Sequence, residues 1–295
     1  SVFGLGSILY AIIEAPTHGW MSNETLGVAA LGVLLMVAFV TWERRVEHPL
    51  LPMGLFGDRG FTIGLMAIMF AFFVMFSFMF TQMLHFQLVR DKTALEAAIR
   101  FLPLPLGLGP VAANSDRLVE RFGSRNVVTT GLVLVSLGMA LFTTVDVGTA
   151  YPVIGATFLL LGVGMGLTMA PSTTLVMDAV PDDKAGVGSA TNDASREIGG
   201  ALGIAIGGSV LNEYYQRSMS IPEGLEHLGS VPLESFPAAM RIGGEMLAEG
   251  NMAGLELIEA ARASFVEGMV ASAMVGGAIA LTTAFVVRAY MPGRD

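Results

Sequence analysis

The sequence contains no cysteine, and its four histidines are scattered along 295 residues. The absence of cysteine excludes disulfides, cysteine-ligated zinc and thiol nucleophiles. The histidines lack the four-residue helical spacing that is typical of a metal site; they are His18, His48, His85 and His227. We therefore expect neither a metal ion nor a cofactor.

Charge is scarce as well. Charged residues make up 14% of the chain, against about 25% in soluble domains, and hydrophobic residues make up 53%. This composition excludes a single soluble globule and a disordered chain. The 16 basic and 25 acidic residues give a net charge of −9, the wrong sign for binding a phosphate backbone. We expect a membrane protein that is surrounded by a lipid bilayer and has no nucleic acid partner.

Eight apolar runs are candidates for helices that cross a bilayer, which need about 20 mostly apolar residues. Stretches such as 131–142 do not alternate polar and apolar residues, so helices are favoured over barrel strands. The predicted spans are Ser1–Ile13, Leu26–Trp42, Phe61–Leu84, Ala97–Ala113, Val127–Val145, Pro152–Val176, Ser189–Leu211 and Phe265–Ala289. The sequence thus predicts an all-α polytopic membrane protein.

The first predicted span is short because the chain opens inside an apolar run, Ser1–Ile13. No basic segment precedes this run and no small-residue cleavage site follows it, so it does not have the pattern of a signal peptide. We expect the chain to start partway through a membrane helix, and to be the C-terminal part of a longer protein.

Basic residues gather in alternate loops, which predicts the orientation in the membrane. Nine lysines or arginines lie in or beside the loops 43–60, 114–126 and 177–188 and the C-terminal tail, whereas the short loops on the other side hold two. Aromatic side chains that favour the headgroup level mark the predicted helix ends: Trp20, Trp42, Tyr151, Tyr214, Tyr215 and Tyr290. We expect a bacterial plasma-membrane protein with a cytoplasmic C-terminus.

Most of the acidity falls in one predicted outer loop, residues 212–264. From Asn212 to Glu267 there are nine glutamates and three arginines, which gives −6 of the total −9. Apolar residues at helical spacing predict short amphipathic helices over Ala238–Leu247 and Leu255–Phe265. A solvated acidic loop is the favoured interpretation, and a loop that binds a partner is the alternative.

Polar residues inside two spans are candidates for a substrate cavity, because polar groups in hydrocarbon are costly. In the third span they fall on one face near its outer end, and in the sixth they surround Pro171. The candidates are Ser77, Thr81, Gln82, Thr168, Ser172 and Thr173. One turn further out, His85 and Gln87 are expected at headgroup level, and Glu14 at the end of the first span is expected to be interfacial.

Proline and glycine mark spans that bend or pack closely. Pro103, Pro105 and Pro110 remove backbone donors from the fourth span, which we expect to be bent or broken. Gly162 and Gly166 lie four residues apart in the sixth span and share a face for close packing. Two interpretations of the fourth span stay open, a mobile helix beside a transport pathway and a kinked packing helix.

The seventh span combines a glycine ladder with a polar cluster. Gly199, Gly203 and Gly207 repeat every four residues, which indicates close packing against another helix. Asn192 and Arg196 precede this ladder on one face, where Arg196 can pair with a nearby polar residue or with another helix. The cluster is either a gate between helices or a solvated helix entry.

The segment 114–131 reads NSDRLVERFGSRNVVTTG. It resembles the basic cytoplasmic signature of the major facilitator superfamily, whose core is Gly-x-Leu-Ala-Asp-Arg-x-Gly-Arg-Arg. The residues that fall on this signature are Leu118, Glu120, Arg121, Gly123 and Arg125. The chain departs from it at Asp116 in place of the first glycine, at Glu120 in place of aspartate and at Ser124 in place of arginine.

Further stretches resemble the fourteen-helix drug:proton antiporter branch of that superfamily. They are the Gly19–Trp20 turn, the linker 43–56, the Thr81–Gln82 pair and the segments 162–176 and 180–203. The resemblance implies a C-terminal six-helix bundle over residues 61–295, with its outer loop at 212–264. Residues 1–60 would form two extra transmembrane helices, the first truncated, and a cytoplasmic linker.

The resemblance also implies proton-coupled efflux of small lipophilic or amphipathic drug-like compounds by alternating access. The partners would be the substrate, protons and a missing N-terminal six-helix half. The third and sixth spans would line the cavity, and the fourth and seventh would form the moving interface. The gating or interface candidates are Glu120, Arg121, Gly123, Arg125, Asn192, Arg196, Gly199, Gly203 and Gly207. The two loop arginines can instead be simple topological anchors.

Two other classes of function compete with transport. A non-transporting membrane scaffold, or a half-bundle that needs a partner chain, is the alternative. An intramembrane enzyme is disfavoured, because the sequence places no Ser/His or Asp/Asp pair deep in a predicted span.

Overall fold

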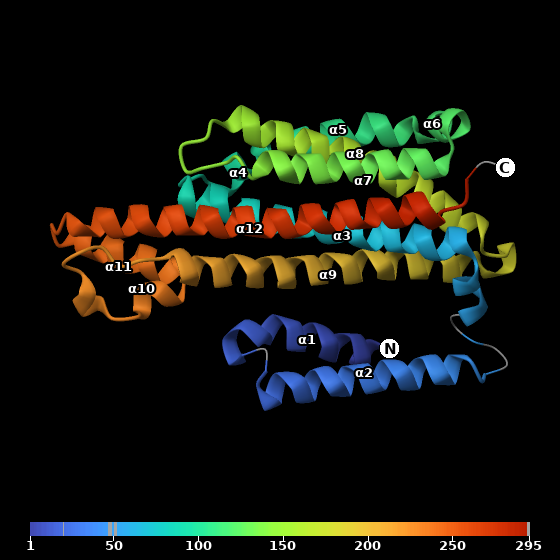
Figure 1. Cartoon of the computed structure of the whole chain (residues 1–295), viewed down its shortest axis with the longest axis horizontal. Coiled ribbons are helices and arrows are strands. Elements are labelled where there is room, and N and C mark those ends of the chain that lie inside the picture. The colour runs from blue at the N-terminus through green and yellow to red at the C-terminus, as the bar shows by residue number, and fades with distance from the viewer. Residues whose placement is uncertain (20, 47–48, 50–51, 294–295) are drawn as a thin grey trace.

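The computed structural model describes residues 1–19, 21–46, 49 and 52–293. In these residues, long helices run side by side and are joined by short turns (Figure 1). The long elements are α1 (Val2–His18), α2 (Asn23–Glu43), α3 (Arg59–Leu84), α5 (Pro103–Ala113), α7 (Ser124–Phe142), α8 (Tyr151–Asp178), α9 (Ala185–Ser218), α11 (Phe236–Ala248) and α12 (Ala253–Tyr290). The short ones are η1 (Met53–Gly57), the π-helical turn η2 (His85–Val89), α4 (Ala94–Arg100), α6 (Ser115–Phe122), η3 (Asp182–Lys184), η4 (Glu226–Leu228) and α10 (Val231–Glu234).

Six helices among the described residues are long and apolar enough to cross a membrane. They are Asn23–Glu43, Arg59–Val89, Ala94–Ala113, Ser124–Phe142, Tyr151–Asp178 and Ala253–Tyr290. The predicted span 189–211 lies inside α9, which falls short in apolarity because its first turns carry the polar cluster around Arg196. The chain is an integral membrane protein. Trp20, His48, Arg294 and part of the predicted linker lie outside the described residues.

Helix α3 is the centre of the bundle and packs against α8, α9 and α12. Helix α7 packs between α8 and α12, and α5 covers the outside of α8. The α1–α2 hairpin lies beside α9 as a separate pair (Figure 1). The connections alternate between the two ends of the bundle, so the end of α2, the short helix α6, the turn between α8 and α9 and the end of α12 share one end (Figure 1).

Local capping explains where two of the elements begin. The Asp58 carboxylate accepts a hydrogen bond from the Phe61 amide at 2.8 Å and so starts α3. Thr93 and Glu96 form a reciprocal capping box that starts α4. The predicted break in the fourth span is confirmed, because α4 ends at Arg100 and α5 begins anew at Pro103.

Glycines let the helices approach one another closely, as predicted for the sixth and seventh spans. A side chain on Gly162 would meet the Leu104 carbonyl of α5. Side chains on Gly199 and Gly203 would collide with the Met69 and Phe73 carbonyls of α3. The glycine ladder therefore packs α9 onto α3 inside this bundle.

The two ends of the predicted outer loop, residues 212–264, are helical continuations of the flanking spans. Helix α9 continues to Ser218 and α12 begins at Ala253. The predicted separate helix over 255–265 is therefore wrong, whereas the one over 238–247 is confirmed as α11. The physical reason is length: the 38 residues of α12 span about 57 Å at 1.5 Å per residue, well beyond the roughly 30 Å of hydrocarbon.

The protruding helices carry a small cap with an aromatic core. The Phe236 and Phe265 rings lie 4.5 Å apart between centroids, and the Tyr215 hydroxyl donates to the Pro232 carbonyl at 2.9 Å. Tyr215 is completely buried, so its expected position at headgroup level is wrong. It lies under the cap because α9 extends past the predicted boundary.

The α3–α9 contact generates the first prediction. Gly203→Leu should lower the free energy of unfolding by about 1–3 kcal/mol, the usual cost of overpacking, because the new side chain meets backbone. Thermal unfolding in detergent measures this change. Gly186→Leu, on the same helix but with open space around its Cα, is the matched control and should have little effect. Equal melting temperatures for the two variants would contradict the packing.

Candidate functional site

Three phenylalanines form a row along α3, which we call the aromatic stripe: Phe72, Phe76 and Phe80. They are four residues apart and therefore share one face of the helix. The Phe72 and Phe76 rings stack with their centroids 5.9 Å apart. Phe76 remains 38% exposed, and the other two are half-buried. The stripe is thus an apolar aromatic surface that the bundle covers only in part.

A second row of glycines on α9 keeps the stripe open. A Cβ at Gly200 would lie 3.2 Å from the Phe76 ring, and one at Gly208 would lie 3.3 Å from the Phe80 ring. These glycines differ from the ladder that packs onto α3, since they border the stripe on its α9 side. Helix α9 therefore flanks the rings without placing side chains over them.

Arg196 lies at one end of the stripe and connects three helices. Its guanidinium carbon is 5.6 Å from the Phe72 ring centroid on α3, a favourable cation–π distance. Its Nη2 donates to the Thr173 hydroxyl of α8 at 3.2 Å, and its Nη1 lies 3.5 Å from an Asp193 carboxylate oxygen. Arg196 therefore contacts its own helix and two others, which are two of the pairings that the sequence allows.

The predicted cavity residues of the third span point into the bundle and not toward the aromatic stripe. Ser77, Thr81 and Gln82 are all buried. The Ser77 hydroxyl lies 3.4 Å from the Ser272 hydroxyl of α12, and the Thr81 hydroxyl donates to the Phe78 carbonyl at 3.0 Å. The structure thus does not place them on an open surface. One residue along a helix turns the side chain by about 100°, so positions 77 and 81 face inward where 76 and 80 face out.

The three candidates of the sixth span differ in position, since two lie inside the bundle and one lies beside the aromatic stripe. Thr168 donates to the Gly164 carbonyl at 2.8 Å and packs against Gly131 of α7. Ser172 is fully buried, and its hydroxyl has no hydrogen-bond partner among the described residues. Thr173 alone of the six candidates contacts Arg196 beside the aromatic stripe.

Sequence reasoning missed the aromatic stripe. Its signal is present, since Phe72, Phe76 and Phe80 recur at i, i+4 and i+8. These rings lie in a segment that is apolar on every side, so periodicity alone could not separate an open face from a packed one. The polar residues beside them were predicted as the cavity instead, because they stand out from an otherwise apolar segment.

The basic loop 114–126 forms the short helix α6 and a tight turn. Gly123 has φ of +79°, a conformation that favours glycine. Glu120 and Arg121 are exposed, and the Arg121 guanidinium lies 5.2 Å over the neighbouring Phe122 ring. Arg121 takes part in no ion pair with the part of the chain that the structure describes.

Arg125 has a different role from the one expected. Its Nε donates to the Met291 carbonyl at 2.7 Å, just after α12 ends. Arg125 therefore ties the C-terminal end of the last helix to the start of α7 within the same bundle. Arg121 makes no comparable hydrogen bond to another element among the described residues, and it is exposed.

The remaining interface candidates lie inside the bundle. Asn192 is buried and precedes Gly199 by two helical turns, on the face of α9 that meets α3. Gly207 approaches the Ser77 hydroxyl. These residues hold α9 in place and do not form the surface that the fourth and seventh spans were expected to share with another bundle.

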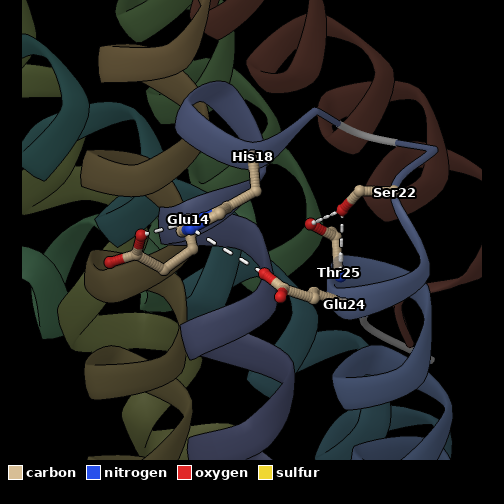
Figure 2. A network of polar contacts seen from close by, with 5 residues as sticks. All are labelled: Glu14, His18, Ser22, Glu24 and Thr25. Atoms are coloured by element: carbon tan, nitrogen blue, oxygen red, sulfur yellow. Dashed lines mark hydrogen bonds and ion pairs between the residues drawn. The ribbon is translucent and has the colours of Figure 1, made fainter.

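Two histidines, His18 and His85, lie at the end of the structure opposite α6. Figure 2 shows the α1–α2 turn, where His18 Nδ1 lies 3.3 Å from the Glu14 carboxylate and His18 Nε2 lies 3.9 Å from Glu24. The partly exposed Glu14 thus belongs to the turn, in keeping with an interfacial position. His85 is fully buried, which corrects its expected place among the headgroups, because η2 turns the ring back into the bundle.

Residues 1–204 match the family model of the Major Facilitator Superfamily. The multidrug resistance protein Stp of Mycobacterium tuberculosis is 28% identical over 289 residues, which cover 94% of this chain and 53% of that protein. The multidrug efflux pump LfrA of Mycolicibacterium smegmatis is 27% identical, covering 93% of this chain and 54% of the pump.

The tetracenomycin C resistance and export protein of Streptomyces glaucescens is 26% identical, covering 95% of this chain and 53% of that protein. The chain spans about half the length of these curated relatives. By their names, these relatives are resistance, efflux and export proteins.

Proposed function

Because the chain belongs to the major facilitator superfamily, we propose that it forms the C-terminal half of a proton-coupled exporter of lipophilic or amphipathic drug-like compounds. The names of its relatives, which are resistance and efflux proteins, support this proposal. In the proposed exporter, a second, N-terminal six-helix half faces the aromatic stripe. Substrate binds between the halves, and rocking of one half against the other exposes it to each side in turn.

The open aromatic stripe is the observation that carries the proposal. A pocket for drug-sized ligands is mostly apolar and aromatic, with a few placed polar groups. The stripe supplies three rings, while Arg196 and Thr173 supply a charge and a hydroxyl at one end. Such a surface can bind many lipophilic compounds, because it offers few groups that require a hydrogen bond of fixed geometry.

The proposed organisation follows from the same arrangement. Residues 1–60 are an extra helix pair with a linker, and residues 61–295 are the transport bundle. The end that carries the short connections with most of the lysines and arginines, 44–58, 114–123 and 179–184, faces the cytoplasm together with the C-terminus, because short loops that hold lysine and arginine stay inside. The acidic cap around α11 then lies outside.

The basic loop acts as a gate in this proposal. Arg121 projects from α6 at the cytoplasmic end and is free to bridge to an acid or a helix end of the other half. Gly123 permits the turn between α6 and α7, Glu120 lies beside Arg121, and Arg125 anchors this turn to the end of α12. The bridge by Arg121 would hold the cytoplasmic side closed.

Transport by the full-length protein in proteoliposomes tests the proposal. An inward proton gradient should drive export of a lipophilic cationic dye, and Phe76→Ala should weaken the apparent dye affinity about 2- to 10-fold. That range corresponds to the loss of roughly 0.5–1.5 kcal/mol of aromatic contact. Phe70→Ala, on the same helix but beside α12, is the matched control and should leave affinity unchanged. Absence of proton-driven export in the wild type would favour a non-transporting scaffold.

The gate is tested by a second pair of variants. Arg121→Ala should slow dye efflux severalfold while insertion and melting temperature stay at wild-type values, because Arg121 makes no ion pair within the described residues of this bundle. Arg117→Ala removes another exposed charge of α6 and should retain efflux. Equal efflux by wild type and Arg121→Ala would show that Arg121 is only a topological anchor.

A further inference from the structure

A buried histidine at the outer end of α3 has no part in the substrate surface. His85 is completely buried in the π-helical turn that follows α3. An ionisable residue within a membrane span is costly to keep and by default indicates a function. π-Helical turns are also frequent at functional sites.

The neighbours of His85 select its neutral form. Arg90 Nε donates to His85 Nε2 at 3.3 Å, and His85 Nδ1 lies 3.4 Å from the Gln82 carbonyl oxygen Oε1. Guanidinium can only donate hydrogen bonds, so Nε2 must offer a lone pair while Nδ1 carries the ring hydrogen and donates to Gln82. The geometry therefore fits a neutral imidazole with its proton on Nδ1.

Arg90 connects this histidine to a distant segment. Its Nη2 donates to the Thr149 carbonyl at 2.7 Å, in the loop 143–150 between α7 and α8. Burial lowers the pKa of Arg90, the Asp146 carboxylate of the same loop raises it, and Arg100 of α4 lowers it. The ion pair between the adjacent Asp91 and Arg262 of α12 completes the charged surroundings of the turn.

We propose that His85 and Arg90 form a proton-sensitive latch that holds the outer end of the bundle closed. The proton comes from the outer aqueous phase and binds the lone pair of His85 Nε2. The Arg90 hydrogen bond to Nε2 is thereby lost, and Arg90 leaves both His85 and Thr149. The loop 143–150 is then released from the end of α3.

The direction of the pH dependence follows from charge. A protonated His85 next to Arg90 places two cations side by side and two donors without an acceptor between them. The closed latch is thus stable while the imidazole is neutral. It begins to weaken once the outer pH falls below the ordinary histidine pKa of about 6.5, and it weakens further at lower pH because burial beside Arg90 disfavours the charged ring. This latch rests on the proposed function, since protons that enter from outside would then open the outer end for substrate release.

Spin-label distances in the full-length protein in lipid nanodiscs test the latch without requiring transport. The chain has no cysteine, so Leu88→Cys and Val147→Cys give two unique labels on the partly exposed surfaces of η2 and the loop. Between about pH 8 and about pH 4, a range that reaches well below the ordinary histidine pKa because the charged ring is disfavoured beside Arg90, the distance distribution should shift toward longer distances.

Two variants and one control make the test specific. His85→Gln keeps an acceptor for Arg90 but takes up no proton, so its distances should match the short wild-type ones at both pH values. Arg90→Gln should give the long distances at both. His227→Gln removes an exposed histidine of the outer loop and should shift with pH as the wild type does. A pH shift that persists in His85→Gln, or is absent from the wild type, would overturn the latch.

Failure of the latch can be distinguished from failure of the proposed export function. A wild-type shift that His85→Gln abolishes supports the latch even if reconstituted protein exports no dye. Proton-driven export with pH-independent label distances would retain the exporter and exclude the latch.

Discussion

The close approach of α9 to α3 is the constraint on which the rest of the structure depends. At Gly199 and Gly203 a single methyl group would run into α3 backbone, so these two helices can meet at this distance only through glycine. This contact fixes the rotation of α3 about its own axis. It turns Ser77 and Thr81 inward and leaves Phe72, Phe76 and Phe80 on the uncovered side. The aromatic stripe and the position of Arg196 both follow from it.

The two ends of the bundle are stabilised by different contacts. At the end that carries α6, Arg125 joins the last helix to α7, and Arg121 is exposed. At the opposite end, α9 and α12 extend past the hydrocarbon and bury Tyr215 and Phe265 under a cap. The polar groups that remain buried there, Gln82 and His85, belong to one chain of contacts that ends at the loop 143–150.

Most of the architecture could be predicted from the sequence because hydrocarbon permits few alternatives. Long apolar runs form helices, the prolines at 103 and 105 favour a new helix start, and a glycine ladder favours close packing against a neighbour. The substrate surface could not be predicted in this way. Polar residues such as Ser77 and Thr168 satisfy their hydroxyls on nearby atoms within the bundle, and their identity does not reveal which face is open. The burial of His85 depends on a π-helical turn, which leaves no periodic signal in the sequence.

Thiol labelling along α3 tests the central claim most directly. Single cysteines at 76, 77, 80 and 81 in the full-length protein are treated with a membrane-impermeant maleimide in the presence and absence of a lipophilic dye. The structure predicts that positions 76 and 80 react and are protected by the dye, whereas 77 and 81 stay unreactive. Reaction and dye protection at 77 and 81, with 76 and 80 silent, would contradict the orientation of α3 and the site built on it.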